Sequence, residues 1–266
     1  MSHAIEGKWA LVTGASSGLG VHFGHELARR KANLVLVARR EDRLRELADE
    51  LRAKHEVETD IVPMDLGTDD APLALHRLMG ERGHDIDVLV NNAGFGLHGA
   101  DRTIAWDRVR AMIQLDIVTL VHLTRLFRDD MIARGRGRIL QVASIGAYQP
   151  CPNYAAYAAA KAFVASYGEA LAHELHGTGV SCTVLSPGVT ATEFFDASGQ
   201  GDRLTTFQRR SMMQPEDVAR IGIEAMLAGR PAVVPGFMNT LNAWMARVIP
   251  RRMATAIAGK STGTGA

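Results

Sequence analysis

Three side chains suited to acid–base chemistry lie in one short stretch of the sequence. Ser144 comes just after an apolar run at 139–142, which is typical of a buried strand. Tyr157 and Lys161 are four residues apart in an alanine-rich stretch, so on a helix they share one face. The spacing therefore predicts a phenol beside an ammonium, with a hydroxyl delivered from the end of a strand. A Y-x-x-x-K pair also arises by chance, so its meaning depends on the rest of the chain.

This arrangement suits proton transfer to and from an oxygen atom of a substrate. A free phenol has a pKa of about 10, which is too high for an efficient base near neutrality. We expect the ammonium of Lys161 to favour the phenolate and so to lower the pKa of Tyr157. Ser144 can donate a hydrogen bond to the substrate oxygen and hold it against Tyr157, the expected acid and base. Tyr148 and Tyr154 lie nearby, but neither has a lysine four residues further on.

The hydrophobic pattern predicts a framework of alternating strands and helices to position these groups. Apolar runs predict strands at 9–13, 33–38, 57–63, 86–90, 139–142, 180–185 and 232–234. Helical spacing predicts helices at 19–31, 41–54, 69–82, 106–133 and 215–228, and a helix that carries Tyr157 and runs to about 176. Such alternation predicts an α/β fold, a doubly wound parallel sheet with helices on both faces. Because no repeat or linker precedes residue 236, we interpret residues 1–236 as a single domain.

A glycine-rich turn joins the first predicted strand to the first predicted helix. Gly14, Gly18 and Gly20 form a G-x-x-x-G-x-G pattern, which lets a backbone approach a pyrophosphate resting on the helix N-terminus. A glycine turn alone can be just a tight connection, but its place in the first strand–helix–strand unit favours nucleotide binding. Further cofactor contacts are then expected from Ser16, Ser17 and Leu19.

The end of the second predicted strand indicates which dinucleotide is bound. An acidic residue there would bind the ribose 2′-hydroxyl of NAD, whereas this chain has Arg39 followed by Arg40. A guanidinium favours a 2′-phosphate, so Arg39 predicts NADP(H) rather than NAD(H). The alternative is that both arginines merely cap a surface turn.

Taken in order, these motifs resemble the short-chain dehydrogenase/reductase family in its shorter, classical form, over about residues 5–236. The spacing also matches, since Tyr157 follows Ser144 by 13 residues. The matching positions are Thr13, Gly14, Gly18, Gly20, Asp65, Asn91, Asn92, Ala93, Gly94, Ser144, Tyr157, Lys161, Pro187 and Gly188. The resemblance implies a Rossmann-like sheet of about seven strands and hydride transfer between nicotinamide and an alcohol/carbonyl pair. It also implies that Asp65 contacts adenine, that Lys161 holds the nicotinamide ribose, and that further contacts come from Asn92, Ala93, Gly94, Pro187, Gly188 and Thr190.

Asp116 departs from the family pattern, which usually has asparagine at this position. That asparagine helps to hold a helix irregularity whose carbonyl binds a water linking the lysine to solvent. Aspartate has the same shape but no N–H donor, and its charge can pair with Lys161. We therefore place Asp116 in the catalytic group, with either a re-tuned proton relay or simple tolerance as the outcome.

Composition and charge exclude several classes of function. Thirty basic and 29 acidic residues give a net charge of +1, so no field favours nucleic acid. Two cysteines form neither a metal spacing nor a disulfide framework, and the histidine pairs His22/His25 and His173/His176 lack a metal-binding order, so no metal is expected. No signal peptide and no transmembrane segment is evident, and we expect a cytoplasmic protein.

The substrate end is expected in loops at 95–99, 145–154 and 191–213. The last holds Phe194, Phe195, Met212 and Met213 and carries Gly199 and Gly201, as a mobile lid over a hydrophobic substrate would. An ordinary surface helix and loop is the alternative.

The chain continues beyond this domain with an amphipathic segment at 237–258 and a tail at 259–266, which we expect to be disordered. The segment suits packing on a neighbouring subunit of a homodimer or homotetramer, covering of the active site, or peripheral membrane contact through 237–252.

The sequence thus predicts an NADP(H)-dependent carbonyl reductase or alcohol dehydrogenase that acts on a small-molecule substrate. A protein that keeps the fold but serves as a non-catalytic sensor is one alternative. Epimerase or dehydratase chemistry on nucleotide sugars is another, but its relatives usually have a G-x-x-G-x-x-G turn and a larger C-terminal domain, which this chain lacks.

Overall fold

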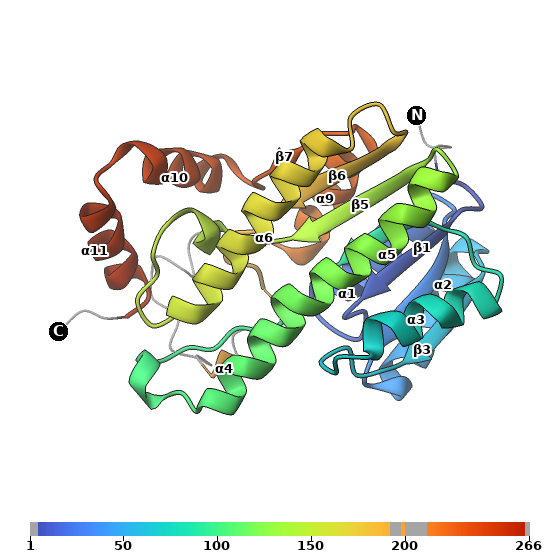
Figure 1. The fold of residues 1–266 in the computed structure, drawn as a ribbon, viewed down its shortest axis with the longest axis horizontal. Helices are drawn as coiled ribbons and strands as arrows, with labels where there is room; N and C mark the ends of the chain where they lie inside the picture. The colour runs from blue at the N-terminus through green and yellow to red at the C-terminus, as the bar shows by residue number, and fades with distance from the viewer. Residues whose placement is uncertain (1–4, 192–197, 200–211, 264–266) are drawn as a thin grey trace.

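Seven parallel strands form the central sheet of the computed structural model, which describes residues 5–191, 198–199 and 212–263 (Figure 1). Their order across the sheet is β3-β2-β1-β4-β5-β6-β7. The strands are β1 (Trp9–Thr13), β2 (Asn33–Ala38), β3 (Thr59–Pro63), β4 (Ile86–Asn91), β5 (Gly137–Val142), β6 (Val180–Leu185) and β7 (Ala232–Val233). The predicted doubly wound α/β sheet is therefore confirmed.

Helices cover both faces of this sheet because neighbouring residues of each strand point to opposite sides. Ala10 and Val12 pack toward α1, α2 and α9, whereas Leu11 packs toward α3, α5 and α6. The helices on the first face are α1 (Leu19–Ala28), α2 (Glu41–His55) and α9 (Pro215–Leu227). Those on the second are α3 (Ala71–Glu81), α5 (Leu120–Ala133) and α6 (Ala155–Glu174).

The strand order reverses between β1 and β4, and there the sheet opens a crevice at its carboxyl edge. Thr13 joins the two strand ends: its hydroxyl donates to the Val90 carbonyl (3.2 Å) and accepts from the Asn92 and Ala93 N–H groups (both 3.0 Å). One threonine therefore fixes how the glycine turn lies against the loop after β4.

The helix predicted at 106–133 is not continuous. It consists of α4 (Trp106–Ile113), a π-helical segment η2 (Gln114–Thr119) and α5. A π-helical turn takes up one extra residue and leaves backbone groups out of the α-helical pattern. Asp116 lies in this segment, where the resemblance implied a helix irregularity.

The C-terminal segment folds back as two helices, α10 (Phe237–Val248) and α11 (Arg251–Ser261), beside the loops at the crevice (Figure 1). Thr262 anchors its end, since its hydroxyl donates to the Pro152 carbonyl (2.8 Å) and its own carbonyl accepts from Asn153 (3.3 Å). The prediction of disorder from Gly259 onward is therefore wrong for residues 259–263, while 264–266 lie outside the described residues. Most of the predicted lid, including Phe194 and Phe195, also lies outside them.

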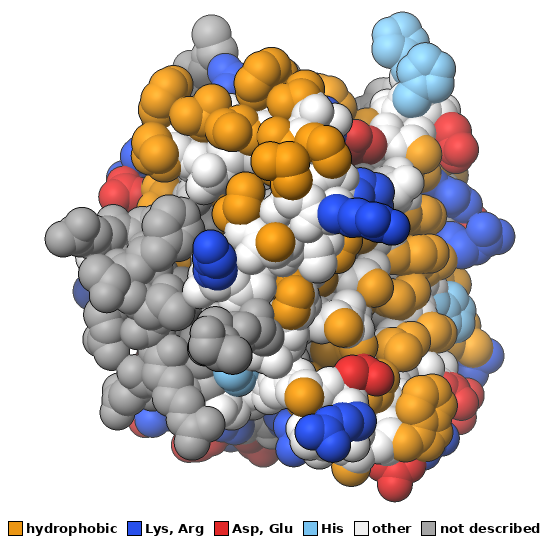
Figure 2. Space-filling view, turned by 90° about the vertical axis from the view of Figure 1, so that its left-hand side faces the viewer, with side chains coloured by type: hydrophobic (Ala, Val, Ile, Leu, Met, Phe, Trp, Pro, Cys, Tyr) orange, Lys and Arg blue, Asp and Glu red, His pale blue; other side chains and the backbone are white. Residues whose placement is uncertain are grey.

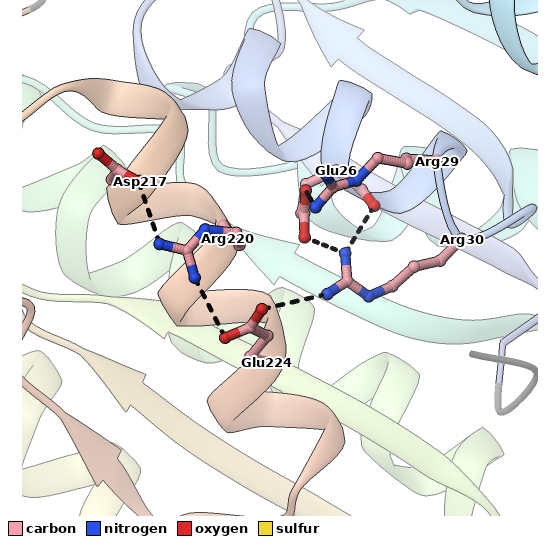
Figure 3. Close-up of polar contacts among 6 residues, drawn as sticks. All are labelled: Glu26, Arg29, Arg30, Asp217, Arg220 and Glu224. Atoms are coloured by element: carbon pink, nitrogen blue, oxygen red, sulfur yellow. Dashed lines mark hydrogen bonds and ion pairs between the residues drawn. The ribbon is translucent and has the colours of Figure 1, made fainter. Parts of the chain in front are cut away.

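A chain of ionic groups joins α1 to α9 (Figure 3). Glu26, which is buried, pairs with Arg29 (2.6 Å) and with Arg30. Arg30 also lies 3.8 Å from Glu224 of α9, which accepts from Arg220 (3.5 Å). Because Glu26 has little contact with water, the two arginines supply its charged hydrogen-bond partners.

Replacing Glu26 with Gln should lower the free energy of unfolding by about 1–3 kcal/mol, because the charge-assisted hydrogen bonds to Arg29 and Arg30 are lost. Denaturant titration measures this quantity. The matched control is Glu46→Gln, which removes an exposed ion pair with Arg43 (3.6 Å) and should cost about 0.5 kcal/mol or less. Equal effects of the two changes would show that the α1–α9 network adds nothing.

Candidate active site

A cavity of about 1440 Å³ runs along the carboxyl ends of the strands. It brings together nearly all residues that the sequence indicated, namely Gly14, Ser16, Ser17, Gly18, Leu19, Arg39, Asp65, Asn92, Ala93, Gly94, Ser144, Tyr157, Lys161, Pro187, Gly188 and Thr190. Two predicted residues are not in its lining. Gly20 and Asp116 lie behind it, and each supports a group that does line it.

The glycine turn has a backbone that non-glycine residues rarely adopt. Gly14 and Gly18 have φ values of 67° and 54°. Gly20 instead permits close packing, because a Cβ there would overlap the Gly14 carbonyl. Among the residues that the structure describes, no side chain caps the start of α1, so the N–H groups of its first turn stand at the positive end of the helix dipole without a side-chain partner. This is a fitting cradle for a pyrophosphate.

Asn92 holds the turn in place. Its amide donates to the Thr13 carbonyl (2.9 Å), and a Cβ on Gly14 would meet the same amide nitrogen at 2.9 Å. The predicted contact residue is therefore also a structural support for the turn.

Two guanidinium groups lie at the end of β2. Arg39 and Arg40 both line the cavity, and Arg40 donates to the Ser16 carbonyl (3.0 Å) and hydroxyl (3.3 Å). The sequence placed Arg39 at the cofactor; Arg40 is equally placed, with its guanidinium held against the glycine turn. Asp65 lies across the cavity end, where its carboxylate accepts from the Gly67 N–H (2.9 Å).

Ser144 and Tyr157 meet at the other end of the cavity. β5 ends at Val142, so Ser144 projects from the sheet edge, and its hydroxyl accepts from the Gly146 N–H (3.1 Å). The first turns of α6 are rich in alanine, the best helix former. This helix places Tyr157 beside Ser144. The phenol is hydrogen-bonded to Ser144.

Lys161 lies one turn along α6, behind the phenol. Its ammonium is 5.7 Å from the centre of the Tyr157 ring and donates to the Val142 carbonyl (3.2 Å). It also lies 3.0 Å from Asp116 Oδ2. The ion pair that the sequence allowed between these two residues is therefore present.

Asp116 is fully buried. The π-helical segment directs its carboxylate to the loop after β4, where Oδ1 accepts from the Phe95 N–H (3.0 Å). Gly94 makes room for it, since a Cβ there would lie 2.8 Å from Oδ1. Burial raises the pKa of Asp116, and the charge of Lys161 opposes this shift.

The electrostatics of Tyr157 differ from the expectation. Its pKa is raised above the ordinary phenol value, first by burial and then by the negative charge of Asp116, while the hydrogen bond to Ser144 acts in the opposite direction. The predicted lowering of this pKa is therefore not found for the protein alone. The main reason is burial of the phenol, and the negative charge of Asp116 adds to it.

The C-terminal helices supply residues that the sequence reading left out of the site. Asn239, Asn242, Ala246 and Ile249 of the α10 stretch line the cavity, as does Thr262. Asn239 is buried, donates to the Pro235 carbonyl (2.8 Å) and fills the space beside Gly188, where a Cβ would overlap it. The amphipathic pattern of the segment contains the sign that one side of α10 lines the cavity, because residues 239, 242 and 246 share its less apolar side. One side of the extension covers the cavity, which is one of the three arrangements considered for it.

Further side chains complete the end of the cavity beyond Tyr157. The Tyr154 ring lies 5.8 Å from that of Tyr157, and Phe95, Leu115 and Ile145 add apolar surface. Among the described residues, no cluster of His, Cys, Asp or Glu has the arrangement of a metal site.

Comparison with known proteins identifies similar chains. The short chain dehydrogenase family profile matches residues 8–203. An NADP-dependent 3-hydroxy acid dehydrogenase of Schizosaccharomyces pombe is 31% identical, over 86% of this chain and 91% of its own. A solved 7beta-hydroxysteroid dehydrogenase has a TM-score of 0.86 at 26% identity, covering 96% of this chain and 98% of its own. A Sphingobium yanoikuyae short-chain dehydrogenase in complex with NADPH has a TM-score of 0.80 at 25% identity, covering 92% and 97%.

Replacing Asp116 with Asn should lower the pKa of Tyr157, because a nearby negative charge disappears and Lys161 is no longer offset. The resonance of a ¹³Cζ-labelled Tyr157, assigned with Tyr157→Phe, reports this pKa directly. The control is Asp107→Asn, which removes an exposed carboxylate from α4 and should leave the titration in place. An unchanged Tyr157 pKa in Asp116→Asn would contradict the electrostatic account.

Proposed function

The chain belongs to the short-chain dehydrogenase/reductase family. We therefore propose that it is an NADP(H)-dependent oxidoreductase. We propose that it transfers a hydride between the nicotinamide and a hydrophobic alcohol, ketone or aldehyde, with Tyr157 as the acid and base. A homodimer or homotetramer and a cytoplasmic location stay predictions.

One observation supports this proposal above the others. Ser144, Tyr157 and Lys161 stand together at one end of a cavity whose other end is a glycine turn at a helix N-terminus. A protein that only sensed the nucleotide would need the turn but not the complete acid–base group. The group therefore favours an enzyme over a non-catalytic sensor.

The residues present fit a phosphorylated dinucleotide. The uncapped N-terminus of α1 and the turn at Gly14 and Gly18 suit the pyrophosphate. Arg39 and Arg40 suit a 2′-phosphate, and no acidic side chain stands at the end of β2 to bind a 2′-hydroxyl. When bound, the cofactor supplies the hydride and, in its oxidised form, a positive charge.

In the reduction, the substrate carbonyl oxygen accepts a hydrogen bond from Ser144 and lies against the phenol. As the carbon gains the hydride, negative charge develops on this oxygen, and Tyr157 delivers its proton there. Lys161 then lies beside the phenolate and stabilises it. In the oxidation the proton travels the opposite way, from the alcohol to the phenolate.

The raised pKa of Tyr157 means that the phenol holds its proton near neutrality, which is the form that reduction needs. A phenol whose pKa lies above its ordinary value is protonated at pH 7 and is ready to act as an acid. Oxidation needs the phenolate, whose fraction increases with pH until the folded-state pKa is passed. The oxidation rate is therefore expected to increase toward alkaline pH.

The substrate is proposed to be hydrophobic. Tyr154, Phe95, Leu115, Ile145 and Ile249 line the cavity beyond Tyr157, and apolar linings favour substrates that lose hydration on binding. Two of the similar proteins are named for 3-hydroxy acids and for a 7beta-hydroxysteroid, and both of these compounds carry the hydroxyl group that the proposed chemistry needs.

Tyr157→Phe should lower kcat by about 10²–10⁴-fold, because the proton donor is lost while the ring remains. NADPH oxidation with a panel of hydrophobic ketones measures turnover, and fluorescence titration should show unchanged NADPH binding. Tyr167→Phe is the matched control, since Tyr167 lies on the same helix and its hydroxyl has no partner among the described residues. Wild-type turnover in Tyr157→Phe would contradict the proposed chemistry.

Arg39→Asp and Arg40→Asp should each weaken NADPH binding by about tenfold or more, because a charged hydrogen-bond partner of the 2′-phosphate is replaced by a repelling charge. NADH binding should weaken much less, so the ratio of the two Kd values is the measurement. Arg43→Asp, on α2 outside the cavity lining, serves as the control. If the ratio of the NADPH and NADH Kd values were unchanged in both variants, the proposed preference for NADP(H) would be contradicted.

A further inference from the structure

The outer face of α10 and α11 exposes a group of large apolar side chains. Phe237 is 80% exposed, Trp244 60% and Val248 59%. Met238, Leu241 and Met253, which do not line the cavity, are also exposed on these helices. Figure 2 shows hydrophobic side chains gathered on this side of the molecule, over the region of α10. Contiguous apolar surface of this kind is unusual on a protein that has no partner.

α10 has two faces with different roles. The side that bears Asn239, Asn242 and Ala246 lines the cavity, whereas Phe237, Trp244 and Val248 point away from it. Packing against the cavity therefore explains one face of the helix only. The other face has nothing to bury it among the residues that the structure describes.

The charge of this segment is one-sided. After Gly236 the sequence has four basic residues and no acidic one: Arg247, Arg251, Arg252 and Lys260. Because the whole chain carries +1, residues 1–236 carry a net charge of −3 once these four are set aside. In the part of the chain that is described, Arg251, Arg252 and Lys260 make no ion pair.

We propose that this outer face of α10 and α11 docks on the surface of a lipid bilayer that contains anionic headgroups. The apolar side chains, a tryptophan among them, would enter the interfacial region, while the arginines contact the headgroups. The helices are amphipathic and lie along the molecular surface, so they suit contact with the plane of a bilayer. No described helix has the length and apolarity to cross it.

Charge favours this occupant over a second copy of the chain. A two-fold contact would place the same face on both sides and bring like charges together, with no acidic side chain in 237–266 to compensate them. An anionic surface compensates all of them. Docking does not depend on the proposed reaction, and vesicle binding can be measured without turnover.

The test is flotation of the full-length protein with vesicles of phosphatidylcholine alone or mixed with phosphatidylglycerol. Wild type should float with the mixed vesicles and far less with phosphatidylcholine, and high salt should release it. Phe237→Ser combined with Trp244→Ser should abolish flotation. Arg251→Glu combined with Arg252→Glu should weaken binding to the mixed vesicles by about tenfold or more. None of these four residues lines the cavity, so NADPH binding should stay as in wild type.

Two controls separate this face from general surface effects. Trp106→Ser removes an exposed tryptophan from α4, and Arg43→Glu combined with Arg45→Glu reverses two charges on α2; both should float as wild type does. In a variant whose only tryptophan is Trp244, brominated phosphatidylcholine in mixed vesicles should quench the tryptophan fluorescence. This variant leaves the docking face unchanged. Absence of quenching, or equal flotation of the face variants and wild type, would overturn the proposal. So would a lipid-free oligomer that Phe237→Ser/Trp244→Ser converts to monomers while wild type ignores the vesicles.

Discussion

The buried contact between Asp116 and Lys161 is the constraint on which the arrangement of the site depends. Two opposite charges are withdrawn from water together, and their remaining hydrogen bonds go to the backbone at Phe95 and Val142. Removing one partner would leave the other charge buried without compensation, which is costly in a protein interior. The pair therefore ties the loop after β4, the π-helical segment and α6 into one unit. Tyr157 stands on this unit, so its position follows from the pair.

The same contact determines the charge that surrounds the phenol. Burial is the main cause that raises the pKa of the phenol, and the carboxylate of Asp116 adds to it. This carboxylate stands where the family pattern has an amide, so one departure from the pattern places a negative charge beside Lys161 and near Tyr157.

Much of the fold and of the site is predictable from local sequence, because strands and helices have short-range signatures. Ser144 at a strand end, Tyr157 and Lys161 one helical turn apart, and the turn at Gly14 needed nothing more. The π-helical segment was not predictable in that way, since its apolar spacing is that of an ordinary helix. Neither was the return of the C-terminus, where Thr262 bonds to a residue 110 positions earlier. The sign of the shift at Tyr157 depends on burial, which a linear pattern does not contain.

The cavity is built from two parts of the chain with unequal freedom to change. Its cofactor end is formed by strand edges and glycine turns, where a Cβ would strike neighbouring backbone, so few substitutions are tolerated. Its far end is closed by the last two helices, which contact the body through Asn239 beside Gly188, through Arg247 beside Tyr148 and Glu169, and through Thr262. These contacts lie on loops and on α6, outside the strands, so a terminal segment of this kind can be exchanged without disturbing the sheet. Selection or design can therefore alter the far end of the cavity by replacing this segment as a unit, provided that these contacts are kept.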